Sequence, residues 1–117
     1  MDNTQDTTIR PWGFFTNLFR KDKYLVKVIH VNPGQRLSVQ SHNHRSEHWF
    51  VTEGLANVIL DNKEITLKTG DSLDIPVKSI HSLQNNTQEA VEVIEIQQGE
   101  ILSEDDIIRY SDIYGRA

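Results

Sequence analysis

The sequence predicts an all-β fold, either a sandwich or a barrel. Short segments rich in β-branched and aromatic residues recur along the chain, and residues typical of turns separate them. This regular spacing of short strands is typical of sandwiches and barrels. In chain order the expected strands span residues 24–31, 36–40, 49–52, 56–60, 64–67, 72–75, 79–84 and 91–97.

Turn residues limit the first expected strands. Segment 24–31 is rich in valine and isoleucine and ends at the Asn-Pro-Gly sequence of residues 32–34. Segment 36–40 runs into a group of histidines, and segment 49–52 ends at Glu53-Gly54. These boundaries predict separate strands rather than one long element.

The later segments follow the same rule. Segments 56–60 and 64–67 flank Asp61-Asn62-Lys63, which predicts a hairpin with a short loop. Segment 72–75 precedes a proline, segment 79–84 precedes two asparagines, and segment 91–97 is the last long strand. After it, Ser103 can cap a helix whose first turn is acidic, as the helix dipole favours. We therefore expect a short C-terminal helix.

Composition and charge exclude several classes of protein. The chain has 117 residues, enough for one domain, and its net charge of -5 argues against nucleic acid or an anionic membrane as a partner. It has no cysteine, and its N-terminal residues lack the basic and apolar regions of a signal peptide. No apolar run approaches the ~18 residues of a membrane helix. We expect a soluble, cytoplasmic protein with a disordered tail over residues 1–8 and a single domain over residues 9–117.

Three histidines and one carboxylate could surround a single metal ion. His42 and His44 are two residues apart, so they would share a face of a strand. Glu47 follows after a short step, and antiparallel packing could bring His81 alongside. This set suits Zn, Mn, Fe, Co or Ni and leaves a position open for substrate or water. Such a histidine pair also arises by chance on exposed strands, so the residues alone leave ordinary surface histidines as an alternative.

The same residues resemble the two-part signature of the cupin superfamily, whose fold is a double-stranded β-helix, a jelly-roll barrel. In order, the signature positions are filled by Gly34, His42, His44, Glu47 and Gly54, and then by Gly70, Pro76, His81 and Asn85. The gap after Gly34 is two residues longer than usual, and Lys78 stands where glycine is usual. The resemblance implies that His42, His44, Glu47 and His81 ligate one divalent metal ion.

Within the cupins, the chain resembles the C-terminal domain of type II phosphomannose isomerases. That domain often follows a mannose-1-phosphate guanylyltransferase in one bifunctional chain. The similar segments are residues 10–13, 33–40, 42–49, 104–109 and 112–116. The resemblance implies a free-standing isomerase that interconverts mannose 6-phosphate and fructose 6-phosphate through a cis-enediol. A metal would polarise the carbonyl, and a general base would move the proton.

A phosphosugar requires cations, and the guanidinium fork of arginine can pair with two phosphate oxygens. The candidate substrate contacts are Arg36, Gln40, Arg45, Lys78 and Arg109, with Arg116 as a further candidate in the tail. Each of them also has an ordinary structural interpretation, such as a turn, a rim position or an ion pair. The family commonly has arginine directly after the last metal histidine, where this chain has Ser82. Lys78 is the expected replacement for that contact.

The sequence does not identify the catalytic base. Arg45 and His48 are weak candidates, and strand alternation places His48 opposite Glu47, which favours a packing role.

Three functions remain open at this point. A metal-dependent mannose-6-phosphate isomerase is the leading hypothesis. The alternatives are a non-catalytic sugar-binding or regulatory cupin, and another cupin enzyme such as a dioxygenase or a sugar-nucleotide isomerase. Cations converging near the metal would favour a phosphosugar, and an apolar pocket would favour the dioxygenase. We expect a small sugar phosphate as ligand and a homodimer, because pairing between copies covers exposed strand edges.

Overall fold

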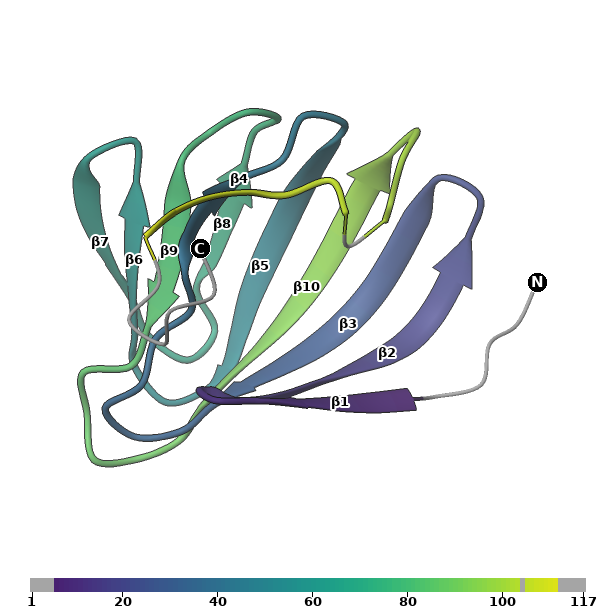
Figure 1. Ribbon diagram of the computed structural model, residues 1–117. Coiled ribbons are helices and arrows are strands. Elements are labelled where there is room, and N and C mark those ends of the chain that lie inside the picture. Colours follow the sequence, from purple (N-terminus) through teal and green to yellow (C-terminus); the bar gives the residue numbers. More distant parts are fainter. Residues whose placement is uncertain (1–5, 104, 112–117) are drawn as a thin grey trace.

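A computed structural model describes residues 6–103 and 105–111 (Figure 1). Within this part of the chain there are eleven strands and no helix. In chain order they are β1 (Asp6–Arg10), β2 (Gly13–Lys21), β3 (Tyr24–Val31), β4 (Val39–Ser41), β5 (Arg45–Glu53), β6 (Ala56–Leu60), β7 (Lys63–Leu67), β8 (Ser72–Ile75), β9 (His81–Gln84), β10 (Val91–Gly99) and β11 (Ile108–Ser111). The predicted all-β fold is confirmed.

The strands form two antiparallel sheets that curve around a common interior (Figure 1). One has six strands in the order β1-β2-β3-β10-β5-β8, and the other has five in the order β11-β4-β9-β6-β7. Strands distant in sequence are therefore neighbours, since β10 pairs with both β3 and β5. This crossing of connections brings residues from both halves of the chain to one interior.

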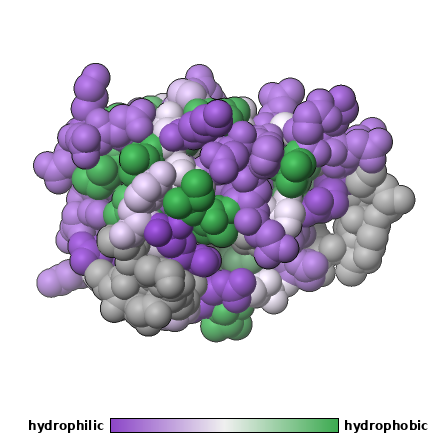
Figure 2. Space-filling model, turned by 45° about the horizontal axis from the view of Figure 1, so that its top comes forward, coloured by the Kyte–Doolittle hydropathy of each residue, from purple (hydrophilic) through white to green (hydrophobic). Residues whose placement is uncertain are grey.

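Alternation along the strands decides which side chains enter the interior. In β3 every second residue, from Leu25 to Val31, is buried, and the same holds for β5 and β10. One end of the interior is apolar, with Val31, Val51 and Val93 fully buried. On the face seen in Figure 2, hydrophobic side chains form small separate groups among hydrophilic ones, as expected when most of the apolar residues lie inside.

The other end of the interior is polar, which is unusual for a barrel core. Lys27, Arg45, Glu47, Glu95 and Gln97 all occupy inward positions and are buried. Because buried charges require partners, this end of the barrel is a candidate functional site rather than a packing core.

The expected C-terminal helix is wrong. Ser103 does cap a turn, because its hydroxyl accepts the N–H of Asp105 and its carbonyl accepts that of Asp106. The chain then enters β11, which pairs with the edge strand β4, with Ile108 opposite Ser41. A helix of only a few residues gains little from its own hydrogen bonds, whereas the edge strand β4 offers unpaired backbone N–H and C=O groups as partners. No described helix is long and apolar enough to cross a membrane.

The N-terminal prediction also needs correction. The expected disordered tail included residues 6–8, but β1 begins at Asp6 and pairs with β2. The hydroxyls of Thr7 and Thr16 are 2.8 Å apart across this pair. Residues 1–5 lie outside the described residues. Neither β1 nor β2 was among the strands predicted from the sequence.

Candidate functional site

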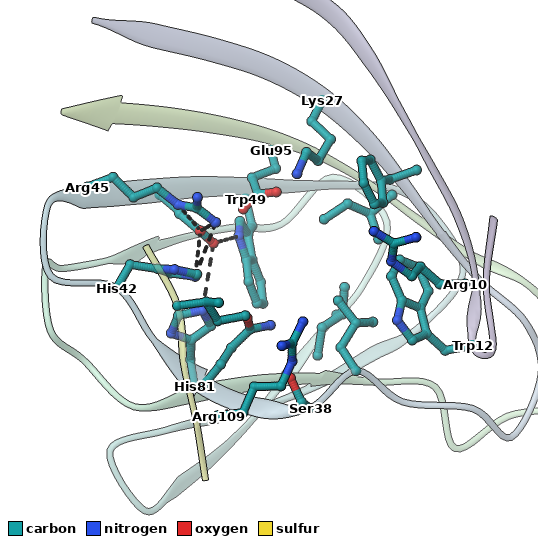
Figure 3. A pocket seen from close by; sticks show the side chains of 17 residues that line it. Arg10, Trp12, Lys27, Ser38, His42, Arg45, Trp49, His81, Glu95 and Arg109 are labelled. Atoms are coloured by element: carbon teal, nitrogen blue, oxygen red, sulfur yellow. Dashed lines mark hydrogen bonds and ion pairs between the residues drawn. The ribbon is translucent and has the colours of Figure 1, made fainter. Parts of the chain in front are cut away.

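A cavity opens at the polar end of the barrel and is lined by residues of both sheets (Figure 3). Its charged lining consists of four cations and two carboxylates, which are Arg10, Lys27, Arg45 and Arg109, and Glu47 and Glu95. His42 and His81 also line it. In Figure 3 the histidines and Arg45 lie on one side of the cavity, and Arg10 and Trp12 lie on the other.

Three of the expected metal ligands meet inside this cavity. His42, Glu47 and His81 are buried, and each offers one ligand atom within 4.8 Å of the others. They come from separate elements, since His42 follows β4, Glu47 lies in β5 and His81 begins β9. The jelly-roll connections therefore assemble the cluster.

Both histidines are oriented for metal binding by hydrogen bonds to backbone carbonyls. His42 Nδ1 lies 2.6 Å from the carbonyl oxygen of Asp106, and His81 Nδ1 lies 2.9 Å from that of Ser79. A carbonyl only accepts, so each Nδ1 carries the hydrogen and each Nε2 has a lone pair that can bind a metal ion. The Nε2 atoms lie 3.2 and 3.8 Å from the Glu47 carboxylate. This arrangement is typical of metal-ligating histidines.

Burial keeps both imidazoles in the neutral, ligating form. Burial, followed by the positive charge of Arg45, lowers the pKa of His42 to about 4. Burial also lowers the pKa of His81. Two neutral imidazoles and a carboxylate are a donor set that fits a divalent transition metal.

Arg45 contacts the cluster directly. Its Nε donates to Glu47 Oε2 at 3.0 Å, and its Nη2 lies 3.0 Å from the same oxygen and 3.2 Å from His42 Nε2. Trp49 Nε1 donates to the other carboxylate oxygen at 2.9 Å. The guanidinium and the indole therefore balance and orient the buried carboxylate.

His44 does not join the cluster. It is exposed, in a bend between β4 and β5, and its backbone N–H donates to the Asp106 carboxylate at 2.9 Å. The expectation that His42 and His44 share a face assumed a strand, but residues 42–44 connect two strands.

Gln40 is the residue that the sheet brings beside the cluster instead. It lines the cavity and lies directly opposite His81 in the pairing of β4 with β9. Its amide oxygen is a suitable fourth donor for a divalent ion. If Gln40 and His42 fill the two histidine positions of the signature, the gap after Gly34 loses its excess of two residues. That spacing was the sequence signal for this assignment.

The remaining predicted residues divide between the cavity and the surface. Arg109 lines the cavity, whereas Arg36 and Lys78 are exposed and do not. Lys78 has a φ of 70°, a conformation that favours glycine, and its N–H donates to the carbonyl of His42. His48 lies outside the cavity lining, with its Nδ1 2.5 Å from Asp74 Oδ1. Arg116 lies outside the described residues.

Three of the charged residues that line the cavity, Arg10, Lys27 and Glu95, were not among the predicted site residues. Lys27 and Glu95 are directly opposite each other on β3 and β10, and both are buried. Burial raises the pKa of the Glu95 carboxyl to about 8, and the negative charge of Glu47 adds to the shift. Lys27 Nζ also lies 4.2 Å from the centre of the Phe15 ring, a cation–π contact. The available signal was a charged residue at an inward position of an otherwise apolar strand.

A family model described as "Mannose-6-phosphate isomerase C-terminal" matches residues 1–112. Among curated proteins, "Alginate biosynthesis protein AlgA" of Pseudomonas aeruginosa is 46% identical over 107 residues, which are 92% of this chain and 22% of that protein. "Mannose-1-phosphate guanylyltransferase" of Escherichia coli is 43% identical over 107 residues, again 92% and 22% of the two chains. The chain thus spans about a fifth of the length of these relatives.

Solved structures show that the fold is a double-stranded β-helix. A Klebsiella pneumoniae protein described as having a double-stranded β-helix domain aligns with a TM-score of 0.73 and 20% identity, over 83% of both chains. The cupin domain of Schizosaccharomyces pombe Cnp3 aligns with a TM-score of 0.71 and 18% identity, over 74% of this chain and 64% of that one. The expected jelly-roll barrel is confirmed.

We expect His42→Ala and His44→Ala to differ sharply in metal affinity. Loss of the buried His42 imidazole should weaken binding of Zn²⁺ at least about 100-fold, because few other donors remain. His44→Ala should stay within about threefold of the unchanged protein, because its side chain is exposed. Isothermal titration calorimetry measures both, and equal losses would show that His44 is a ligand.

Proposed function

The chain belongs to the family of mannose-6-phosphate isomerase C-terminal domains, and we propose that it is a metal-dependent isomerase of mannose 6-phosphate and fructose 6-phosphate. The observation that carries the proposal is the meeting of a three-residue metal-ligand cluster and four cationic side chains in one cavity.

The charge of the cavity supports an anionic substrate. Four cations face two carboxylates there, although the whole chain has a net charge of -5. A cationic cavity in an acidic protein concentrates anions locally. Arg10 and Arg109 line the cavity and could bind a phosphate, whereas the apolar substrate expected for a dioxygenase has no group to pair with them, so the cavity favours a phosphosugar.

His42, Glu47 and His81, with Gln40 as fourth donor, would hold the metal. A divalent ion supplies polarisation of the sugar carbonyl and stabilisation of developing negative charge on its oxygen. Arg45 and Trp49 keep the Glu47 carboxylate oriented toward the two imidazoles.

Arg10 and Arg109 are the proposed phosphate contacts. Both line the cavity and are less buried than Arg45, so their guanidinium groups can meet a ligand that enters from solvent. Figure 3 shows Arg10 across the cavity from the histidines, with Arg109 between the two sides. A sugar phosphate could thus extend from the metal cluster toward these arginines. They would supply the contact that Ser82, next to His81, lacks.

Glu95 is the proposed group that moves the proton between C1 and C2. It is a buried carboxyl in the cavity lining, beside Lys27 and in register with Trp49. The other cavity carboxylate, Glu47, is held by Arg45 and Trp49. Burial raises the pKa of the Glu95 carboxyl to about 8, so this group can take up and release a proton near neutral pH.

We also propose that the chain forms a homodimer through the outer face of the six-stranded sheet. Phe50, Ile94 and Val28 form one row across β5, β10 and β3, and Ile96 and Val26 lie in the next. Phe50 and Ile96 are 41% and 40% exposed, which is high for large apolar side chains on one sheet.

The charges at the two ends of this face favour a second copy as the partner. At one end, residues 20–23 of the β2–β3 hairpin carry three cations and one carboxylate. The opposite ends of β5 and β10 carry Glu53 and Glu92. A second copy related by a two-fold axis across the strands would place each basic end over an acidic one.

The isomerase proposal predicts turnover of mannose 6-phosphate in a coupled assay on metal-reconstituted protein. Glu95→Gln should lower kcat about 100- to 10,000-fold, because the proton-transfer group is lost, while elemental analysis finds the metal content unchanged. Glu64→Gln, an exposed glutamate in β7, serves as the matched control and should retain full activity. Binding of the sugar phosphate without turnover under any divalent ion would instead indicate a non-catalytic sugar-binding cupin.

The dimer proposal predicts a particle of twice the chain mass in light scattering coupled to size-exclusion chromatography. Phe50→Asp should convert it to a folded monomer, because a charge would be buried at the centre of the interface. Val77→Asp, at another exposed apolar residue, is the control that should remain dimeric. A monomeric unchanged protein at micromolar concentration would contradict the proposal.

A further inference from the structure

One buried carboxylate connects the loop of His42 to the C-terminal segment. Asp106 is 9% exposed, and its two carboxylate oxygens accept the backbone N–H groups of Asn43 and His44 at 3.0 and 2.9 Å. Its own carbonyl accepts the Nδ1 hydrogen of His42 at 2.6 Å. A single residue thus makes three hydrogen bonds to the three consecutive residues that follow β4.

These hydrogen bonds replace the interstrand hydrogen bonds that the backbone of the loop lacks. Residues 42–44 lie between β4 and β5, so their backbone groups need partners from elsewhere. A carboxylate that accepts two N–H groups makes strong, charge-assisted hydrogen bonds. Asp106 is itself held in place by the turn at Ser103, because the carbonyl of Ser103 accepts the backbone N–H of Asp106 at 3.0 Å.

The segment that follows Asp106 forms part of the cavity. Ile107 and Arg109 line it, and β11 pairs with β4 through Ile108 opposite Ser41 and Arg109 opposite Gln40. The hydroxyls of Tyr110 and Ser41 are 3.0 Å apart. Figure 1 shows this segment crossing the open end of the barrel to reach β4. The same stretch of chain therefore orients a ligand imidazole and carries a cavity arginine.

Asp106 is not itself a member of the ligand cluster, and it does more than cap its own turn. The cluster found among the described residues comprises His42, Glu47 and His81 alone. A turn cap bonds to neighbours in sequence, whereas the Asp106 carboxylate reaches residues 63 and 62 positions away. Asp106 therefore acts as a clamp, because it connects the C-terminal segment to the loop at residues 42–44.

We propose that Asp106 is a positioning residue that couples metal binding to the docking of the C-terminal segment, residues 105–111. It orients the imidazole of His42, and a metal ion on His42 in turn holds Arg109 beside the cavity. The inference rests on the metal centre of the proposed function but not on isomerase activity. Coupling between two binding events is reciprocal, so each event strengthens the other by the same factor.

The test compares metal affinity with amide hydrogen exchange in the full chain. Titration calorimetry with Zn²⁺ should give a dissociation constant about 10- to 100-fold weaker for Asp106→Ala, the range expected when a partner of a ligand histidine is lost. Asp106→Asn, which keeps one acceptor oxygen, should be intermediate. In the unchanged protein, Zn²⁺ should slow exchange of the Ile108, Arg109 and Tyr110 amides, and in Asp106→Ala this slowing should disappear.

Asp71→Ala is the matched control. Its carboxylate also accepts a backbone N–H, that of Lys68 at 2.8 Å, but in the turn between β7 and β8. It should lower thermal stability and leave both the metal affinity and the effect of Zn²⁺ on exchange unchanged. A purely structural role of Asp106 would make the two variants behave alike.

The proposal would be overturned if Zn²⁺ did not change the exchange rates of the C-terminal amides in the unchanged protein. It would also be overturned if Asp106→Ala bound Zn²⁺ with unchanged affinity. If circular dichroism shows that Asp106→Ala is unfolded, Asp106→Asn decides by the same criteria. A chain that binds no Zn²⁺ refutes the coupling together with the metal centre. Coupling without turnover refutes only the isomerase, and turnover without coupling refutes only the clamp.

Discussion

The buried carboxylate of Glu47 is the constraint on which the rest of this structure depends. A charge removed from water destabilises a protein by several kcal/mol unless partners surround it. Arg45 and Trp49, two positions before and after it on the same face of β5, each donate to it. The two histidines approach it from other elements through their Nε2 atoms. Hydrogen bonds within β5 therefore hold the carboxylate, and the imidazole lone pairs that face it from other elements require a cation among the three groups.

Because of this requirement, one end of the barrel stabilises the fold and the other end forms the candidate site. The apolar end, with Val31, Val51 and Val93, supplies the burial that stabilises the fold. The polar end buries less apolar surface, because two carboxylates and several cations line a confined space there. Proteins accept such local penalties at functional sites, where a ligand later completes the charge balance. The C-terminal segment closes the polar end and contributes both Asp106 and Arg109 to it.

Sequence alone predicted those parts of the molecule that depend on local pattern. The β-branched residues of β3, the turn residues that follow it and the loop at Asp61 were sufficient to identify a strand and a hairpin, and both are present. The C-terminal helix was wrong because the capping signal at Ser103 is local, whereas pairing with β4 is not.

The site was harder to predict for the same reason. His42, Glu47 and His81 were predicted from their place in the cupin signature, but His44 was included by the same signature and by a strand alternation that a loop does not obey. The pairing of Lys27 with Glu95 depends on the register of strands far apart in sequence. That register is not visible in a single sequence.

Anomalous diffraction at the absorption edge of a bound metal tests the central claim most directly. Crystals grown with Zn²⁺ or Co²⁺ should contain one strong anomalous peak in the cavity, bonded to Nε2 of His42 and His81 and to the Glu47 carboxylate. The amide oxygen of Gln40 should complete the set, with His44 outside it. A peak on His44, or a cavity without any peak in metal-saturated protein, would contradict this account of the site.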